Sequence, residues 1–97
     1  MTPGDVFRFI SNGRERGIEG VVAHCGPAGA LLCVRGRWNE ELGNFEPETG
    51  APRAFYACDS KENLLLLGHI ARKEAERMEQ EARQPLRKVV ASGGVSA

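Results

Sequence analysis

The sequence has no surplus of either charge and no long apolar run, and each shortage excludes a class of protein. Thirteen Lys and Arg residues balance thirteen Asp and Glu residues, so the formal net charge is zero. A general nucleic-acid coat protein needs a basic excess to neutralise phosphates, and an acidic disordered tail needs the opposite excess. No apolar run approaches the ~20 residues of a membrane span. We therefore expect a globular chain that makes no membrane contact.

Cysteines are few and do not form a recognisable framework. Cys25, Cys33 and Cys58 are an odd number and widely spaced, which suits a reducing cytosol and predicts a cytoplasmic protein. Together with His24 and His69 they offer soft metal ligands, but their spacing matches no zinc site. Small thiols buried on strands are the simpler interpretation. We expect neither a metal nor another cofactor.

The glycines divide a chain that is long enough for one small domain. Its 97 residues support a single modest core. Ten of the twelve glycines lie between residues 4 and 68, and none lies between residues 69 and 92. The first part therefore predicts short strands joined by tight turns, and the second predicts a helix and a tail. We divide the chain into a β domain over 1–68, a helix with its flank over 69–90, and a disordered tail over 91–97.

Four apolar segments bounded by turn signals predict β-strands, because they are rich in β-branched and aromatic residues. These segments are 6–10, 18–25, 30–35 and 54–58. The Gly-Pro-Ala-Gly sequence at 26–29 is typical of a turn and joins two of them as a hairpin. Glycines, prolines and four glutamates fill 36–53, which predicts a long exposed loop.

The four leucines at 64–67 allow two interpretations. As a short apolar run after a turn, they form a fifth strand. Alternatively, Asp59 with Glu62 three residues later resembles a capping box, which would start a helix before the leucines. Gly68 would cost ~1 kcal/mol inside a helix. We therefore prefer a strand that ends near Leu67 and a helix that starts after Gly68.

A helix is predicted over 70–83 and is ended by Pro85. Good helix formers fill it, and oppositely charged residues stand four apart along it. Its apolar stripe is narrow and consists of Ala71, Ala75, Met78 and Ala82. Small residues bury little area, so two interpretations stand. The helix packs on its own barrel, or it pairs with another helix in a homodimer or a partner complex.

The strand signals follow a familiar order. Pro-Gly-Asp-Val-Phe-Arg-Phe at 3–9 is followed by Gly-Ile-Glu-Gly-Val-Val at 17–22, then Leu-Cys-Val-Arg at 32–35 and a short strand at 63–67. This order resembles small SH3-like barrels of the KOW and Tudor kind. The resemblance implies a mainly β fold, a closed five-stranded SH3-like barrel followed by a C-terminal α-helix. Because the barrel hosts many unrelated activities, the resemblance does not choose a function.

Arginines and aromatic residues gather near the ends of the predicted strands. The candidate partner-binding residues are Trp38, Arg35, Arg37 and Tyr56, with Arg14 and Arg16 in the first loop. Arginine beside an aromatic ring stacks bases and holds phosphates, or forms the centre of a protein interface. In the alternative, structural interpretation Trp38 covers the barrel core. The arginines would then pair with nearby glutamates, which are Glu15, Glu19, Glu40 and Glu41.

No catalytic motif is visible. The chain has no phosphate-binding glycine loop, nucleophile elbow or histidine-rich motif, so we expect no catalytic residues. We expect a non-enzymatic protein-binding module whose specificity comes from the 36–53 loop. Its small size suits a phage-encoded or accessory protein that modulates a larger bacterial machine. The alternative is a KOW-like nucleic-acid or ribonucleoprotein binder, which the zero net charge disfavours.

Overall fold

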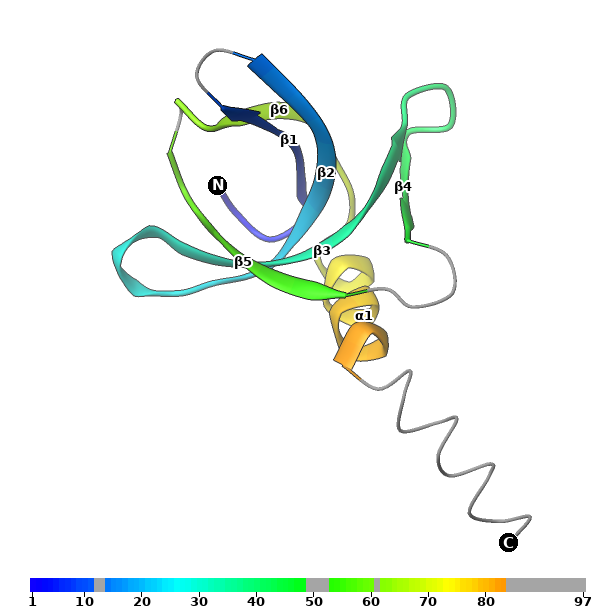
Figure 1. Ribbon diagram of the computed structural model, residues 1–97. Helices are drawn as coiled ribbons and strands as arrows, with labels where there is room; N and C mark the ends of the chain where they lie inside the picture. Colours follow the sequence, from blue (N-terminus) through cyan, green and yellow to red (C-terminus); the bar gives the residue numbers. More distant parts are fainter. Residues whose placement is uncertain (12–13, 49–52, 61, 84–97) are drawn as a thin grey trace, which may run out of the picture.

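The structure is a computed structural model that describes residues 1–11, 14–48, 53–60 and 62–83. Within them, six β-strands precede one α-helix, and Pro27–Gly29 form a short 3₁₀ turn (Figure 1). The strands are β1 (Asp5–Ser11), β2 (Arg14–Cys25), β3 (Ala30–Asn39), β4 (Asn44–Pro47), β5 (Ala54–Cys58) and β6 (Leu64–His69), and the helix is α1 (Arg72–Arg83). In this part of the chain α1 is too short and too polar to cross a membrane.

All the strands belong to one antiparallel sheet. Its order is β4-β3-β2-β1-β6, and β5 pairs with the first half of β3. The sheet curls upon itself, as Figure 1 shows. Among the described residues β5 and β6 do not pair with each other, so the sheet is a half-barrel with an open side. The expected mainly β, SH3-like barrel with a C-terminal helix is confirmed, but the expectation that it is closed was wrong.

The curled sheet buries apolar residues on both of its faces. Neighbouring residues of a strand point to opposite faces, so a buried adjacent pair places one side chain on each. Three consecutive apolar pairs mark this arrangement: Val6-Phe7, Val21-Val22 and Cys33-Val34 are all buried. One member of each pair joins the cluster inside the curl, which contains Phe7, Val22, Leu31, Cys33 and Leu64. The other member joins a second cluster with Phe45, Ile70, Ala75 and Met78. The helix is therefore the cover of a second core, and not an appendage.

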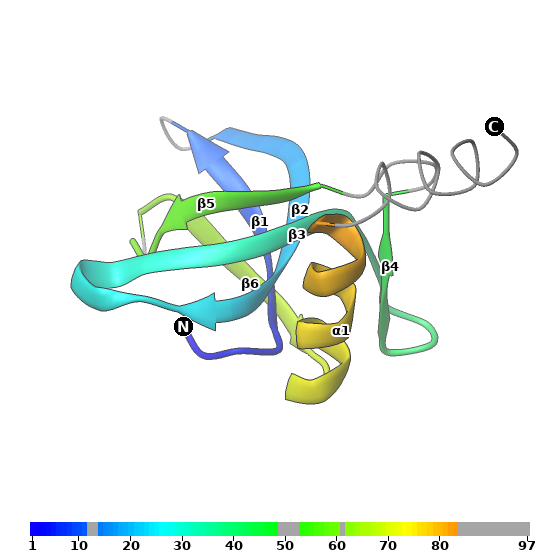
Figure 2. The same ribbon diagram turned by 90° about the horizontal axis from the view of Figure 1, so that it is seen from below.

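The helix docks on its own sheet, as the first of the two interpretations predicted. It packs against β2, β3 and β5 (Figure 2). Ala75 and Met78 are buried in the second cluster, Ala82 packs against that cluster, and Ala71 is exposed. Three of the four stripe residues are thus covered by the chain itself. Pairing of this stripe with another helix would require α1 to leave the sheet.

The predicted loop at 36–53 needs correction. β3 continues to Asn39, and Asn44–Pro47 return as β4, so most of the segment is a β-hairpin. Each strand of this hairpin carries one large aromatic residue, Trp38 or Phe45, and the two are cross-strand partners. Composition alone concealed this signal behind glycines and glutamates. This hairpin supplies the sixth strand. Residues 49–52 of the predicted loop lie outside the described residues.

The remaining boundaries follow the prediction closely. The leucine run at 64–67 is a strand that extends to His69, and α1 starts after Gly68, so the helix-from-Asp59 alternative was wrong. The predicted strand at 54–58 is confirmed as β5. The second strand starts earlier than expected, so the backbone of Arg14 and Arg16 lies in β2 and not in a loop. The predicted helix flank beyond Arg83 and the tail at 91–97 lie outside the described residues.

Candidate functional site

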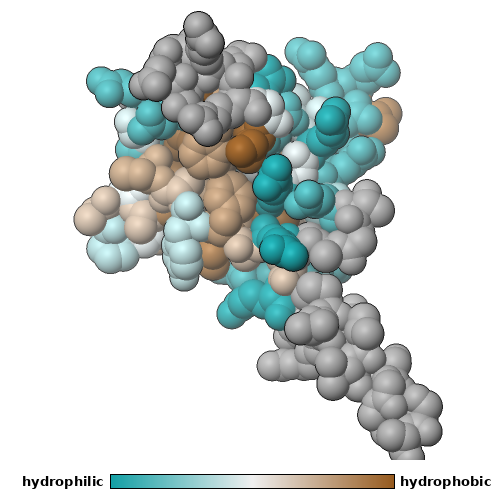
Figure 3. Space-filling view, viewed as in Figure 1, coloured by the Kyte–Doolittle hydropathy of each residue, from teal (hydrophilic) through white to brown (hydrophobic). Residues whose placement is uncertain are grey.

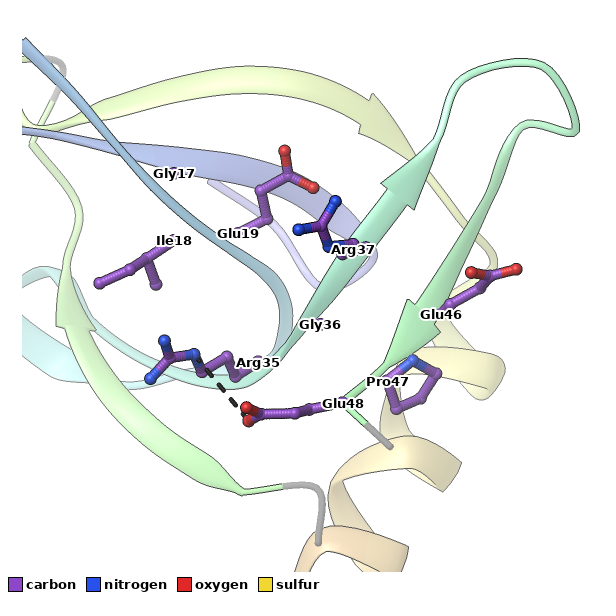
Figure 4. A pocket seen from close by; sticks show the side chains of 9 residues that line it. All are labelled: Gly17, Ile18, Glu19, Arg35, Gly36, Arg37, Glu46, Pro47 and Glu48. Atoms are coloured by element: carbon purple, nitrogen blue, oxygen red, sulfur yellow. Dashed lines mark ion pairs between the residues drawn. The ribbon is translucent and has the colours of Figure 1, made fainter. Parts of the chain in front are cut away.

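The site with the most distinctive geometry lies where β2 and β3 separate. Their pairing runs from Cys25 and Leu31 to Glu19 and Gly36, and then stops. Beyond that point, in the part of the chain that the structure describes, Glu15 and Arg14 of β2 pair with β1, and β3 pairs with β4. A cavity of about 420 Å³ lies at this separation, lined by residues 17–19, 35–37 and 46–48 (Figure 4). We call it the divergence pocket.

Glu19 lies at the point of separation, and its carboxylate links β2 to β3 and to β1 by hydrogen bonds. Its Oε1 accepts a hydrogen bond from the backbone N–H of Trp38 at 2.7 Å. Its Oε2 accepts two more from Arg8, from Nε at 3.1 Å and from Nη2 at 2.9 Å. The carboxylate thus supplies an acceptor that the backbone of β2 no longer offers to β3. The glutamate that we expected to pair with a site arginine pairs with Arg8 instead.

Arg35 and Arg37 both reach the divergence pocket, as their spacing of two along β3 predicts. Arg35 is exposed, and its Nε lies 3.9 Å from Glu48 Oε2, at the outer limit of an ion pair. Arg37 forms no ion pair with any residue that the structure describes. Its cross-strand partner is Glu46, yet Figure 4 shows Arg37 turned toward Glu19 and Glu46 turned away. The guanidinium of Arg37 is therefore uncommitted.

Trp38 has a structural position on the opposite face of β3. Its half-buried indole packs against the second core cluster. A Cβ placed on Gly68 would lie 2.2 Å from Trp38 Cζ2, so the indole rests directly on the backbone of β6. This is the core position that the alternative interpretation predicted. The structure does not bring Trp38 together with Arg35 and Arg37 on one surface.

The other predicted contact residues lie outside the divergence pocket. Tyr56 is 79% exposed on β5, where its strand partner is Leu32. The side chains of Arg14 and Arg16 lie outside the described part of the chain, although their backbone belongs to β2. Of the six candidates, the structure therefore brings two into the pocket and separates two from it.

Sequence reasoning missed Gly17 and Ile18 as pocket residues. Both lie on the stretch of β2 that has lost its β3 neighbour. One signal was available, because Glu19 is a lone carboxylate at the start of an apolar strand. A charge in such a place indicates an internal partner, and hence a local irregularity in the sheet.

A second cavity of about 590 Å³ lies between the β3–β4 turn and the start of α1. Phe45, Ile70 and Met78 supply its apolar lining, and its two ionisable side chains, His69 and Glu74, are already paired. His69 Nδ1 lies 2.7 Å from Asp5 Oδ1, and Glu74 pairs with Arg77. Burial favours the neutral form of Asp5, but the Thr2 N–H and His69 outweigh it, so the pKa of Asp5 lies below its ordinary value. This cavity therefore offers a ligand little unsatisfied chemistry.

Apolar side chains also reach solvent at the open side of the half-barrel. Phe9 and Phe55 are half-buried there, with ring centroids 6.0 Å apart, and Leu66 is exposed on β6. Figure 3 shows apolar residues gathered on the face that carries this opening. The opening supplies apolar contact area but no charge that would select a ligand.

The described residues offer groups that can bind a ligand, but no metal cluster or activated nucleophile. Among them, no group of three His, Cys, Asp or Glu residues is placed to hold a metal ion. Burial raises the pKa of the Cys33 thiol to about 12, so this sulfur is not a nucleophile near neutral pH. The divergence pocket combines an uncommitted guanidinium with the unpaired backbone of a strand. No family model, curated protein or solved structure matches the chain.

Proposed function

We propose that the protein is a non-enzymatic protein-binding module that engages its partner at the divergence pocket. The observation that carries the proposal is the uncommitted Arg37 guanidinium beside the unpaired residues 17–18 of β2. Uncommitted charge and unpaired strand backbone are both means of binding a polypeptide. The loop that we expected to give specificity contributes residues 46–48 to the same pocket.

The setting that we propose is the cytoplasm, where the free cysteines Cys25, Cys33 and Cys58 would stay reduced. The role as a phage-encoded or accessory protein that modulates a larger bacterial machine is part of the same proposal. So is a relation to KOW and Tudor barrels, which rests on the order of the strands.

The proposal is tested by selecting ligands from a library of displayed random peptides on the immobilised full chain. Enriched peptides are then titrated by fluorescence anisotropy against the wild type and against an Arg35→Ala, Arg37→Ala double variant. We expect the double variant to bind about tenfold or more weakly, as the loss of a charged hydrogen-bond donor implies. Arg72→Ala is the matched control, because Arg72 is an exposed arginine on α1 outside the pocket.

Two results would refute the proposal. In the first, no peptide is enriched over a blank surface. In the second, the enriched peptides bind the double variant as tightly as the wild type, which would place the binding surface elsewhere.

Nucleic-acid binding is the second candidate, and one observation favours it. The backbone N–H of Arg35 donates to the carbonyl of Arg53 at 3.2 Å, which places a third exposed arginine beside the pocket. Tyr56, exposed on the following strand, offers a ring for stacking. Glu46 and Glu48 lie among these arginines, however, and reduce the field that phosphates would meet. Binding to single-stranded RNA or DNA that falls steeply with added salt would favour this candidate over the first.

A further inference from the structure

The stretch of β2 that borders the divergence pocket has an unpaired edge. Among the described residues, Arg14 and Glu15 pair with β1, residues 16–18 lie in an irregularity of that pairing, and the register with β3 starts only at Glu19. Space lies beside this stretch, because residues 17–19 line the divergence pocket. An extended peptide can add to such an edge through backbone hydrogen bonds, while pockets beside the edge select its side chains.

The charges around this edge favour a ligand of one sign. The carboxylate of Glu19 is occupied by Arg8 and by the Trp38 N–H, and Glu48 faces Arg35. Glu46 turns away from the divergence pocket, as Figure 4 shows. Each acidic side chain of the pocket thus either has a partner or points away from it. The basic group that has no ion-pair partner among the described residues is the guanidinium of Arg37. Its natural complement is a carboxylate, which a guanidinium binds with two parallel hydrogen bonds.

The sequence of residues 14–18 also favours an acidic ligand. Two more arginines, Arg14 and Arg16, belong to it, and their backbone lies in β2. The single acidic residue between them is Glu15. A peptide that pairs with this part of β2 therefore runs along a basic segment and meets Arg37 at its end.

From these observations we infer that the divergence pocket takes an extended peptide segment that bears carboxylates. The peptide pairs with the backbone of β2 at residues 17–18 and places a carboxylate against the Arg37 guanidinium. The inference rests on the proposed function and specifies the ligand of that site. The carboxylate belongs to an acidic side chain or to a chain terminus, which share this chemistry.

The test uses fluorescein-labelled octapeptides of alternating threonine with a second residue, titrated by anisotropy against the full chain. The second residue is glutamate, glutamine or lysine, and every peptide has an amidated C-terminus. A glutamine peptide with a free C-terminus reports on a terminal carboxylate. A glutamate peptide methylated at alternate backbone nitrogens reports on strand pairing, because it cannot donate the ladder hydrogen bonds.

We expect the glutamate peptide to bind about tenfold or more tightly than the glutamine and lysine peptides. Arg37→Ala should remove that preference, backbone methylation should weaken binding by a similar factor, and Arg72→Ala should change nothing. If the glutamine peptide with a free C-terminus binds as tightly as the glutamate peptide, a chain terminus also serves as the carboxylate source and the inference stands.

Equal binding of the lysine or amidated glutamine peptide would overturn the inference, and so would an Arg37→Ala variant that keeps the acidic preference. Undiminished binding of the methylated peptide would overturn strand pairing. In each of these cases library peptides that still need Arg35 and Arg37 would leave the proposed function standing. If no peptide in either experiment binds, both the inference and the proposed function fail.

Discussion

The Glu19 carboxylate accepts the backbone N–H of Trp38 at 2.7 Å, at the point where β2 and β3 separate. Two strands that part in this way leave backbone groups without neighbours, and such groups are costly when they are shielded from water. The Glu19 side chain reduces that cost here, and it also accepts hydrogen bonds from the Arg8 guanidinium. The shape of the divergence pocket therefore depends on a single half-buried carboxylate.

Replacing Glu19 should destabilise the fold as well as the pocket. In Glu19→Ala, the Trp38 N–H and the Arg8 guanidinium both lose an acceptor, and we expect a loss of about 1–3 kcal/mol in the free energy of unfolding. Urea titration followed by circular dichroism measures it. Glu40→Ala is the control, because Glu40 is exposed in the turn after β3. Equal stability of the two variants would contradict a stabilising role for the Glu19 hydrogen bonds.

The contact between Trp38 and Gly68 predicts a second effect on stability. In Gly68→Ala the new methyl group would lie 2.2 Å from Trp38 Cζ2, so the indole or the strand must move. We expect a loss of about 1–3 kcal/mol, the usual cost of an overpacked site. Trp38 is the only tryptophan of the chain, so its fluorescence reports directly on the displacement.

Gly26→Ala is the matched control for this variant. The nearest heavy atoms to a Cβ at Gly26 are 3.6 Å away, an ordinary contact distance. Its stability and tryptophan emission should stay close to those of the wild type. An unshifted emission maximum and unchanged stability in Gly68→Ala would contradict the packing described for Trp38.

Acid should weaken the fold in part through Asp5. The pKa of Asp5 is lowered in the folded state, so its ionised form stabilises the protein above the ordinary carboxyl pKa. That contribution is lost as the pH falls through the lower, folded-state value. In Asp5→Asn the free energy of unfolding should therefore be lower than in the wild type at pH 7, and the difference should shrink toward pH 2.5. Denaturant titrations across this range measure it, and a difference independent of pH would contradict it.

The three cysteines should differ in reactivity. Burial raises the pKa of the Cys33 thiol to about 12, whereas Cys25 and Cys58 are exposed. Ellman's reagent at pH 8 should therefore titrate two thiols quickly in the native protein and the third only after unfolding. The Cys25→Ser, Cys58→Ser double variant should lose the fast phase completely. Rapid labelling of that variant would show that the interior of the half-barrel opens readily.

Much of the fold could be predicted, because strand signals are local. Turn residues around 6–10, 54–58 and 64–67 bound short apolar runs, and each of these is a strand in the structure. The pairs Val6-Phe7 and Val21-Val22 also hold information that the prediction did not use. Two adjacent apolar residues on each strand imply a sheet buried on both faces, and hence a helix docked on one of them.

The pocket could be predicted only in part, because it depends on where two strands stop pairing. Arg35 and Arg37 stand two apart, which places both on one face. Trp38, next to them, must then face the core, so the three residues could not share a surface on a regular strand. That Gly17 and Ile18 border the site follows from the hairpin of β3 and β4, whose strand signals are diluted by glycine and glutamate.

Replacing Glu79 by an apolar residue should stabilise the protein. It is fully buried between α1 and the sheet, with Oε1 3.2 Å from His24 Nε2. Arg83 Nε lies 2.5 Å from Oε2, but without hydrogen-bond alignment, so this oxygen is buried without a hydrogen bond. Burying a carboxylate costs several kcal/mol unless its partners are well placed. Both partners are largely exposed and would stay hydrated without it.

Methionine has a similar length and helix propensity, and it would extend the apolar contact that Ala75 and Met78 make with the sheet. We expect Glu79→Met to raise the free energy of unfolding by about 1 kcal/mol or more. Glu81→Met is the control, since Glu81 is exposed and pairs with Arg77 on the helix surface, where such pairs contribute little. A loss of stability in Glu79→Met would mean that the pairing of Glu79 with His24 and Arg83, and not apolar burial, holds α1 on the sheet.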